Sequence, residues 1–106
     1  MKKQKALNAF VKKVKEKYGD RVERIILFGS FARGDCSEES DIDLLVITSG
    51  DRFEMQRNLS GMAVDILLER GVYISVKAVT TKEYDFMKKI NTGFYQSIAR
   101  EGVAVG

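Results

Sequence analysis

Two short apolar segments, residues 25–28 and 44–47, constrain the fold of this chain more than any other part of its sequence. Each is an unbroken run of Ile, Leu, Val or Phe, a pattern typical of a strand that is buried on both faces of a sheet. A sheet that contains such strands needs helices packed against it. The rest of the chain must therefore supply those helices.

Helical and strand patterns alternate along the remaining sequence. Apolar residues recur at the spacing of one helix face in two long segments, and a third strand is indicated by alternating apolar and polar residues. Thr80 and Glu83 form a capping box, which marks the beginning of a helix. The expected elements are helices over 3–18, 53–70 and 81–90, strands over 21–28, 42–48 and 72–79, a short helix from about residue 30, and a last helical piece around 94–98.

This alternation predicts the fold class, a small α/β or α+β domain with helices packed on a sheet. The length of 106 residues predicts one domain over residues 1–106. No apolar run approaches the roughly 20 residues of a membrane span, and the basic start is not followed by the apolar segment of a signal peptide. Cys36 is the single cysteine and excludes an internal disulfide, so we expect a reducing, cytoplasmic setting.

Positive charge is concentrated at the beginning of the chain. Residues 1–24 contain nine Lys or Arg residues and three Asp or Glu residues, whereas the whole chain has a net charge of +3. Two interpretations stay open: the solvated face of an amphipathic helix, or a patch that attracts phosphate-bearing ligands. A nucleic-acid partner is the less favoured hypothesis, because no base-reading motif accompanies the charge.

Two acids, Asp41 and Asp43, stand at the beginning of the second apolar strand. Alternate strand residues point to the same face, so the two carboxylates lie side by side while Ile42 points the other way. Neighbouring carboxylates repel each other unless a cation or proton neutralises them. Hard oxygen donors suit Mg²⁺, and the chain has no His. Asp41 and Asp43 are therefore predicted metal ligands.

A small-residue turn follows the first apolar strand. Gly29 has no Cβ and permits close approach of a phosphate, while Ser30 offers a hydroxyl and can begin a short helix whose free N–H groups attract anions. Arg33 lies one helical turn further on, and its guanidinium matches phosphate oxygens. Together with Asp41 and Asp43, this turn predicts a site for a metal-bound polyphosphate.

The string GSFARG at residues 29–34, followed by SDIDLLV at residues 40–46, resembles the minimal nucleotidyltransferase (MNT) family of the DNA polymerase β-like superfamily. The resemblance implies a small mixed β-sheet flanked by helices. Many members, including the MntA-like antitoxins, are encoded beside a HEPN-domain partner and form one half of a toxin–antitoxin pair. Some silence the HEPN toxin by transferring AMP from ATP to it, so ATP and a HEPN-domain protein are the implied substrate and partner.

Carried onto this sequence, the resemblance implies that Gly29 and Ser30 grip the terminal phosphates of the nucleotide. It also implies that Asp41 and Asp43 are catalytic and bind Mg²⁺. Active members of the superfamily usually add a third carboxylate from a neighbouring strand. Here the exposed face of that strand presents Tyr73, Ser75 and Lys77, with no acid.

Two functions consequently remain open at the level of sequence. The first is Mg²⁺-dependent transfer of a nucleoside monophosphate to a hydroxyl of a partner protein. The second is a catalytically weak or silent antitoxin that acts by contact alone, which the missing third acid favours. The third strand and the apolar tail with Val103 and Val105 are also candidate edges for pairing with a second chain, in a homo- or hetero-oligomer.

Overall fold

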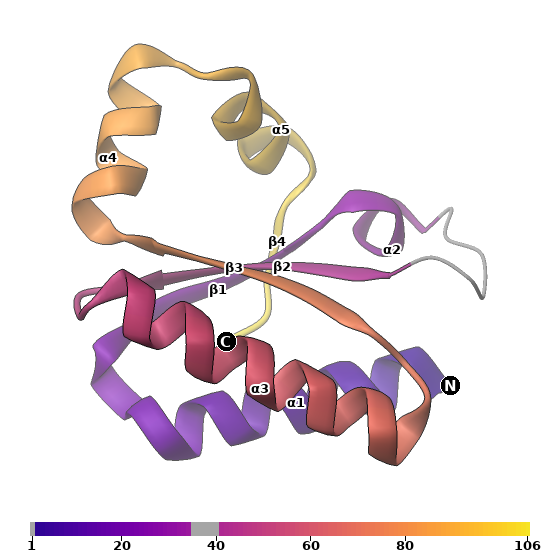
Figure 1. The fold of residues 1–106 in the computed structure, drawn as a ribbon. Helices are drawn as coiled ribbons and strands as arrows, with labels where there is room; N and C mark the ends of the chain where they lie inside the picture. The colour runs from indigo at the N-terminus through magenta and orange to yellow at the C-terminus, as the bar shows by residue number, and fades with distance from the viewer. Residues whose placement is uncertain (1, 35–40) are drawn as a thin grey trace.

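The computed structural model describes residues 2–34 and 41–106. These residues form a four-stranded sheet with helices on both faces, as Figure 1 shows. The elements in chain order are α1 (Lys2–Tyr18), the short 3-10 helix η1 (Gly19–Arg21), β1 (Val22–Phe28), α2 (Gly29–Arg33), β2 (Ile42–Thr48), α3 (Arg52–Arg70), β3 (Ile74–Thr80), α4 (Thr81–Ile90), α5 (Gly93–Glu101) and β4 (Val103–Ala104).

The sheet is mixed, with the strand order β3-β2-β1-β4. Strand β1 pairs antiparallel with both β2 and β4, whereas β2 and β3 run parallel. This architecture confirms the predicted α/β class with a small mixed sheet. The bounds of β2 and α4 agree with the sequence-based prediction, while β3 begins two residues later than expected and β1 one residue later, because η1 includes Arg21.

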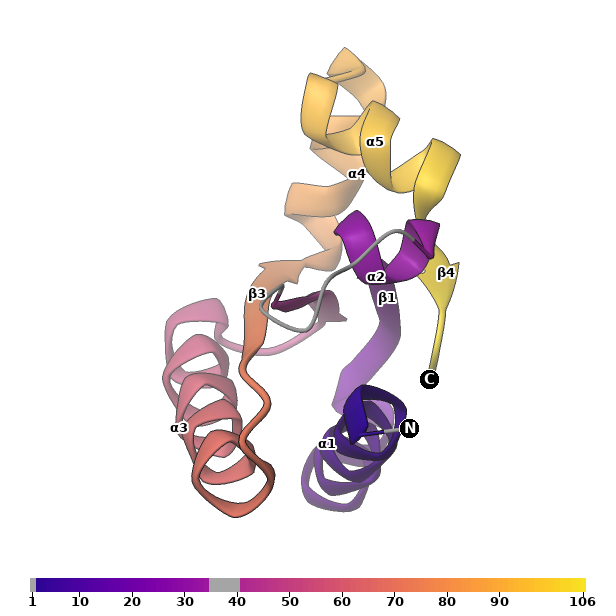
Figure 2. The ribbon, with the colours of Figure 1, turned by 90° about the vertical axis from the view of Figure 1, so that its right-hand side faces the viewer.

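Helices α1 and α3 lie side by side and cover one face of the sheet, as Figures 1 and 2 both show. Their apolar stripes and the residues of β1, β2 and β3 that point to the same side form the larger hydrophobic cluster. Fully buried members of this cluster include Phe10, Val14, Ile42, Leu44, Val46, Met55, Leu59 and Ile66. Most of the apolar burial that stabilises the fold is therefore on this side of the sheet.

The opposite face has a thinner cover made by α4 and α5, with α2 at one end (Figure 1). Its buried cluster is smaller and consists of Ile26, Leu45, Ile47, Val79, Tyr84 and Ile98. The capping box at the beginning of α4 is confirmed, since the Glu83 N–H donates to Thr80 Oγ1 at 3.0 Å and the Thr80 N–H donates to Glu83 Oε1 at 2.9 Å.

Helix α3 also holds the edge strand β3 through one polar side chain. Gln56 Nε2 donates to the Val76 carbonyl at 2.9 Å, and the Ala78 N–H donates to Gln56 Oε1 at 2.7 Å. Within α3, the buried stripe is centred on Leu59 and Ile66, and Leu67 lies at its margin and is 39% exposed.

The apolar tail pairs within the chain. Strand β4 adds to the free edge of β1, with Ile26 opposite Ala104 and Leu27 opposite Val103, and the Val105 N–H donates to the Ile25 carbonyl at 2.9 Å. The tail is thus paired with β1 and forms one edge of the sheet, and its pairing with a second chain stays a prediction. Along the described residues, no helix has the length and apolar character required to cross a membrane.

Candidate functional site

The predicted site residues gather where β1 ends and β2 begins. In the register of the sheet, Asp43 lies between Phe28 of β1 and Ser75 of β3. Its neighbours along the strand, Ile42 and Leu44, belong to the cluster beneath α1 and α3, so Asp43 points to the opposite, thinly covered face. Asp41 precedes the strand and is exposed, whereas Asp43 is half-buried.

Gly29 brings the turn directly against the Asp43 carboxylate. Its φ of +76° lies in the left-handed region that favours glycine. A Cβ atom built at Gly29 would overlap the carboxylate and lie 3.1 Å from Asp43 Cγ. The sequence predicted that Gly29 permits a close approach, and here the approaching group is a carboxylate of the proposed metal site.

Ser30 lies in the first turn of α2 and is half-buried. The helix begins at Gly29, with Phe28 as its N-cap residue, and no side chain caps this end. The expectation that Ser30 begins the helix is corrected by one residue. The Ser30 hydroxyl and the first N–H groups of α2 therefore lie next to the Gly29 turn, where β1 ends.

Arg33, at the end of α2, reaches towards the last helix. Its Nη1 lies 3.1 Å from Glu101 Oε2 of α5. The guanidinium is also close enough to Asp43 to lower the pKa of that carboxyl. The structure thus places Arg33 near Asp43, and it adds Glu101 as a counter-ion that sequence reasoning missed.

The electrostatics of Asp43 are unusual for a surface acid. Burial raises the pKa of the Asp43 carboxyl above its usual value, the charge of Asp41 raises it further, and Arg33 opposes both effects. The charge of Asp41 acts on Asp43 because the two residues are close together at the beginning of β2. A bound cation would relieve both unfavourable contributions, and two oxygen donors fit a divalent ion such as Mg²⁺.

A third acid does not complete this pair in the described part of the chain, where no group of three acidic, His or Cys side chains could share a metal ion. Ser75 occupies the β3 position beside Asp43. Lys77, the next residue on that face, places its Nζ 5.3 Å from the centroid of the Phe94 ring. Phe94 in turn meets Phe28 edge-on, with the ring centroids 5.5 Å apart.

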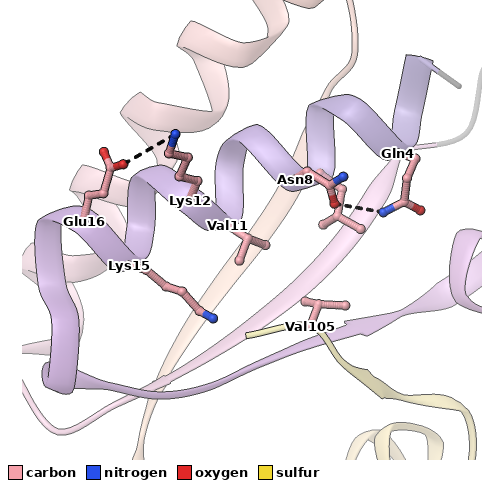
Figure 3. A pocket seen from close by; sticks show the side chains of 8 residues that line it. Gln4, Asn8, Val11, Lys12, Lys15, Glu16 and Val105 are labelled. Carbon is pink, nitrogen blue, oxygen red and sulfur yellow. Dashed lines mark hydrogen bonds and ion pairs between the residues drawn. The ribbon is translucent and has the colours of Figure 1, made fainter.

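A surface groove lies elsewhere, between α1 and the residues after β4 (Figure 3). It has a volume of about 470 Å³, and in Figure 3 Val11, Lys15 and Val105 line it from the two sides. The groove is on the α1 side of the sheet and includes none of the acids described above. This groove is therefore separate from the carboxylate site.

Comparison with protein families gives one match over almost the whole chain. Residues 7–105 match the family described as nucleotidyltransferase domain. The match includes every residue of the predicted site.

Two relatives illustrate the similarity at the level of sequence. A Methanocaldococcus jannaschii protein provisionally named protein adenylyltransferase MJ0604 is 43% identical over 102 residues, which are 96% of each chain. The protein adenylyltransferase MntA of Thermococcus cleftensis is 32% identical over 85 residues, 73% of this chain and 84% of that protein.

Two solved structures share the fold. One is a mutant of the MntA–HpeT toxin–antitoxin complex, with a TM-score of 0.54 and 17% identity over 93% of this chain and 71% of that one. The other is a toxin–antitoxin with AMP-PNP, with a TM-score of 0.51 and 21% identity over 91% of this chain and 69% of that one. At these identities the likeness concerns the fold alone.

Proposed function

The chain belongs to the nucleotidyltransferase domain family, and from that premise we propose that it transfers AMP from ATP to a hydroxyl group of a partner protein. The observation that carries this proposal is the contact between the Gly29 turn and the Asp43 carboxylate, beside Asp41. It joins a phosphate-binding element to a pair of metal-binding acids. Two relatives are named as protein adenylyltransferases, which supports the choice of AMP and of a protein acceptor.

Asp41 and Asp43 are the proposed ligands of Mg²⁺. Burial, and then the charge of Asp41, raise the pKa of the Asp43 carboxyl and so disfavour its charged form, which a divalent cation would stabilise. When bound, the ion would offset charge on the polyphosphate and on the pyrophosphate that leaves. Both carboxylates are therefore proposed to be catalytic.

Gly29, Ser30 and Arg33 are the proposed nucleotide-binding residues. The backbone at Gly29 and the hydroxyl of Ser30 would contact the terminal phosphates, while Arg33 supplies positive charge at the same end of the sheet. In the reaction the acceptor oxygen bonds to the α-phosphorus, the bond from that phosphorus to the bridging oxygen breaks, and the hydroxyl proton passes to solvent. Holding the triphosphate in line for this displacement is the main task of these residues.

The proposed acceptor is a HEPN-domain toxin, with this chain as its antitoxin. The sequence resemblance implies this pairing, and the solved structures that share the fold are described as toxin–antitoxin complexes. The single cysteine fits a reducing compartment, so we place the reaction in the cytoplasm. The exposure of Asp41 agrees with an acceptor supplied by another protein.

A second candidate function is a partner-binding antitoxin without efficient catalysis. The observation that favours it is Ser75, which stands in register with Asp43 where a third acid would assist deprotonation of the acceptor. Nucleotide binding alone would then be retained.

Two measurements test the proposal. The first is titration of the chain with ATP, and the second is transfer of the label from α-labelled ATP to a co-expressed partner protein. We expect ATP binding that requires Mg²⁺, and label transfer that falls about a hundredfold or more in Asp41→Asn and Asp43→Asn. Asp85→Asn, which changes an exposed acid on α4, is the matched control. Near wild-type transfer by Asp43→Asn would contradict the mechanism, whereas binding without transfer by the unaltered chain would favour the second candidate.

A further inference from the structure

Helix α3 is apolar on two opposite sides. Its buried side, formed by Met55, Leu59, Ala63 and Ile66, packs under the sheet. Phe53, Val64 and Leu68 are nevertheless 70%, 46% and 79% exposed. At 3.6 residues per turn these three side chains lie within a sector of about 60°, directly opposite the buried stripe. A surface helix is normally polar on that side, so this face has the character of a helix contact.

Two opposite charges accompany the exposed apolar side chains: Arg57 lies within the same sector of the helix, and Asp65 lies about 60° to one side of it. Arg57 and Asp65 are both exposed, and each stands four residues from Gly61 on the same outward side of α3. Neither residue forms a hydrogen bond or an ion pair with any described part of the chain. A Cβ atom built on Gly61 would have no neighbour within 4 Å, so the backbone there is open to close approach.

We propose that α3 pairs with α3 of a second copy of this chain, antiparallel about a twofold axis at Gly61. Gly61 is the midpoint of Arg52–Arg70, so the two helices would overlap over their full length, roughly 28 Å. Residues equally far from Gly61 in opposite directions become neighbours across the axis. Arg57 of each copy then meets Asp65 of the other, and Phe53 lies within one residue of Leu68.

The arrangement of these charges favours a second copy of this chain as the partner of the exposed face of α3. A twofold interface must be complementary to itself. Because Arg57 and Asp65 are equally far from Gly61, the twofold axis forms two Arg57–Asp65 pairs, one on each side of Gly61. The exposed apolar side chains supply the free energy of association, while the two charge pairs set the register and the antiparallel direction. A parallel arrangement would instead bring Arg57 against Arg57 and Asp65 against Asp65.

The position of α3 keeps this interface separate from the carboxylate site. Figures 1 and 2 place α3 on one side of the sheet, with α4, α5 and α2 on the other. Pairing through α3 therefore leaves Asp41 and Asp43 accessible to nucleotide and acceptor in both copies. The proposed dimer does not depend on the proposed reaction.

Charge reversal tests the arrangement. Sedimentation velocity of the purified chain from micromolar to millimolar concentration should show a monomer–dimer equilibrium. Arg57→Asp and Asp65→Arg should each weaken dimerisation by about tenfold or more, because each creates two like-charge contacts. The double variant should restore it. Lys12→Asp, a charge reversal on α1, is the control and should leave dimerisation unchanged.

A second variant tests the apolar part of the same interface. Leu68→Ser should also weaken dimerisation by about tenfold, with unchanged circular dichroism, since Leu68 is exposed in the single chain. A chain that stays monomeric at every concentration would overturn the proposal. So would a dimer that is insensitive to the single reversals, or a double variant that fails to recover.

Discussion

At the scale of single residues, Gly29 has the strictest requirement in the site. It combines a left-handed φ with a carboxylate in the space of a Cβ atom, whereas Gly34 has a similar φ of +79° and no neighbour within 4 Å. We expect Gly34→Ala to lower the free energy of unfolding by about 1–2 kcal/mol, the cost of the backbone conformation alone. Gly29→Ala should lower it further and displace Asp43. Urea denaturation of both variants measures the difference, and equal losses would show that the carboxylate contact imposes no constraint.

Asp43 leads to a prediction about stability and pH. The folded state raises the pKa of its carboxyl, so folding takes up a proton, and the stability gained at low pH is lost as the pH rises through the folded-state pKa. Without Mg²⁺, Asp43→Asn should therefore unfold at higher urea concentration than the wild type near pH 7. The difference in stability between the variant and the wild type should disappear below pH 3.8, the usual pKa of an aspartate. Asp85→Asn serves as the control, and a less stable Asp43→Asn at pH 7 would refute the account.

At the scale of elements, Gln56 joins helix α3 to the edge strand β3. Its amide satisfies one carbonyl and one N–H of that strand, groups that an edge strand otherwise leaves open to other chains. Gln56→Leu should lower the free energy of unfolding by about 1–3 kcal/mol, because it leaves two part-buried backbone groups unpaired. It should also increase aggregation. Gln4→Leu, at an exposed position of α1, is the control for thermal denaturation and light scattering; an equal effect there would contradict this role.

At the scale of the whole molecule, the two helical layers contribute unequally to stability. Leu59 is fully buried in the larger cluster under α1 and α3, whereas Ile98 belongs to the smaller cluster under α4 and α5. Replacing Leu59 or Ile98 with Ala lowers stability, but the smaller cluster under α4 and α5 can relax around the lost atoms more readily. We expect Leu59→Ala to cost about 4 kcal/mol and Ile98→Ala about 2 kcal/mol. Chemical denaturation distinguishes them, and a greater cost for Ile98→Ala would reverse the assignment.

The whole molecule also shows which parts of the structure the sequence predicts. Strand β2 and the capping box of α4 are encoded by contiguous residues, so local patterns sufficed for them. The motif predicted that a phosphate approaches Gly29, whereas the close approach of the Asp43 carboxylate to Gly29 is visible only in the structure. The pairing of β4 with β1 and the roles of Gln56 and Glu101 depend on contacts between distant segments, and no local periodicity encodes such contacts.

The ion pair between Arg33 and Glu101 has a consequence for the order of events during synthesis. Its partners are 68 residues apart, and Glu101 ends the last helix. A growing chain exposes the Gly29 turn and both acids long before the counter-ion of Arg33 has been made. Contacts that are distant in sequence form late because the intervening loop must close first. The charges around Asp43 thus reach their final balance only once α5 has docked, so a nascent chain would carry the motif before it carries a finished site.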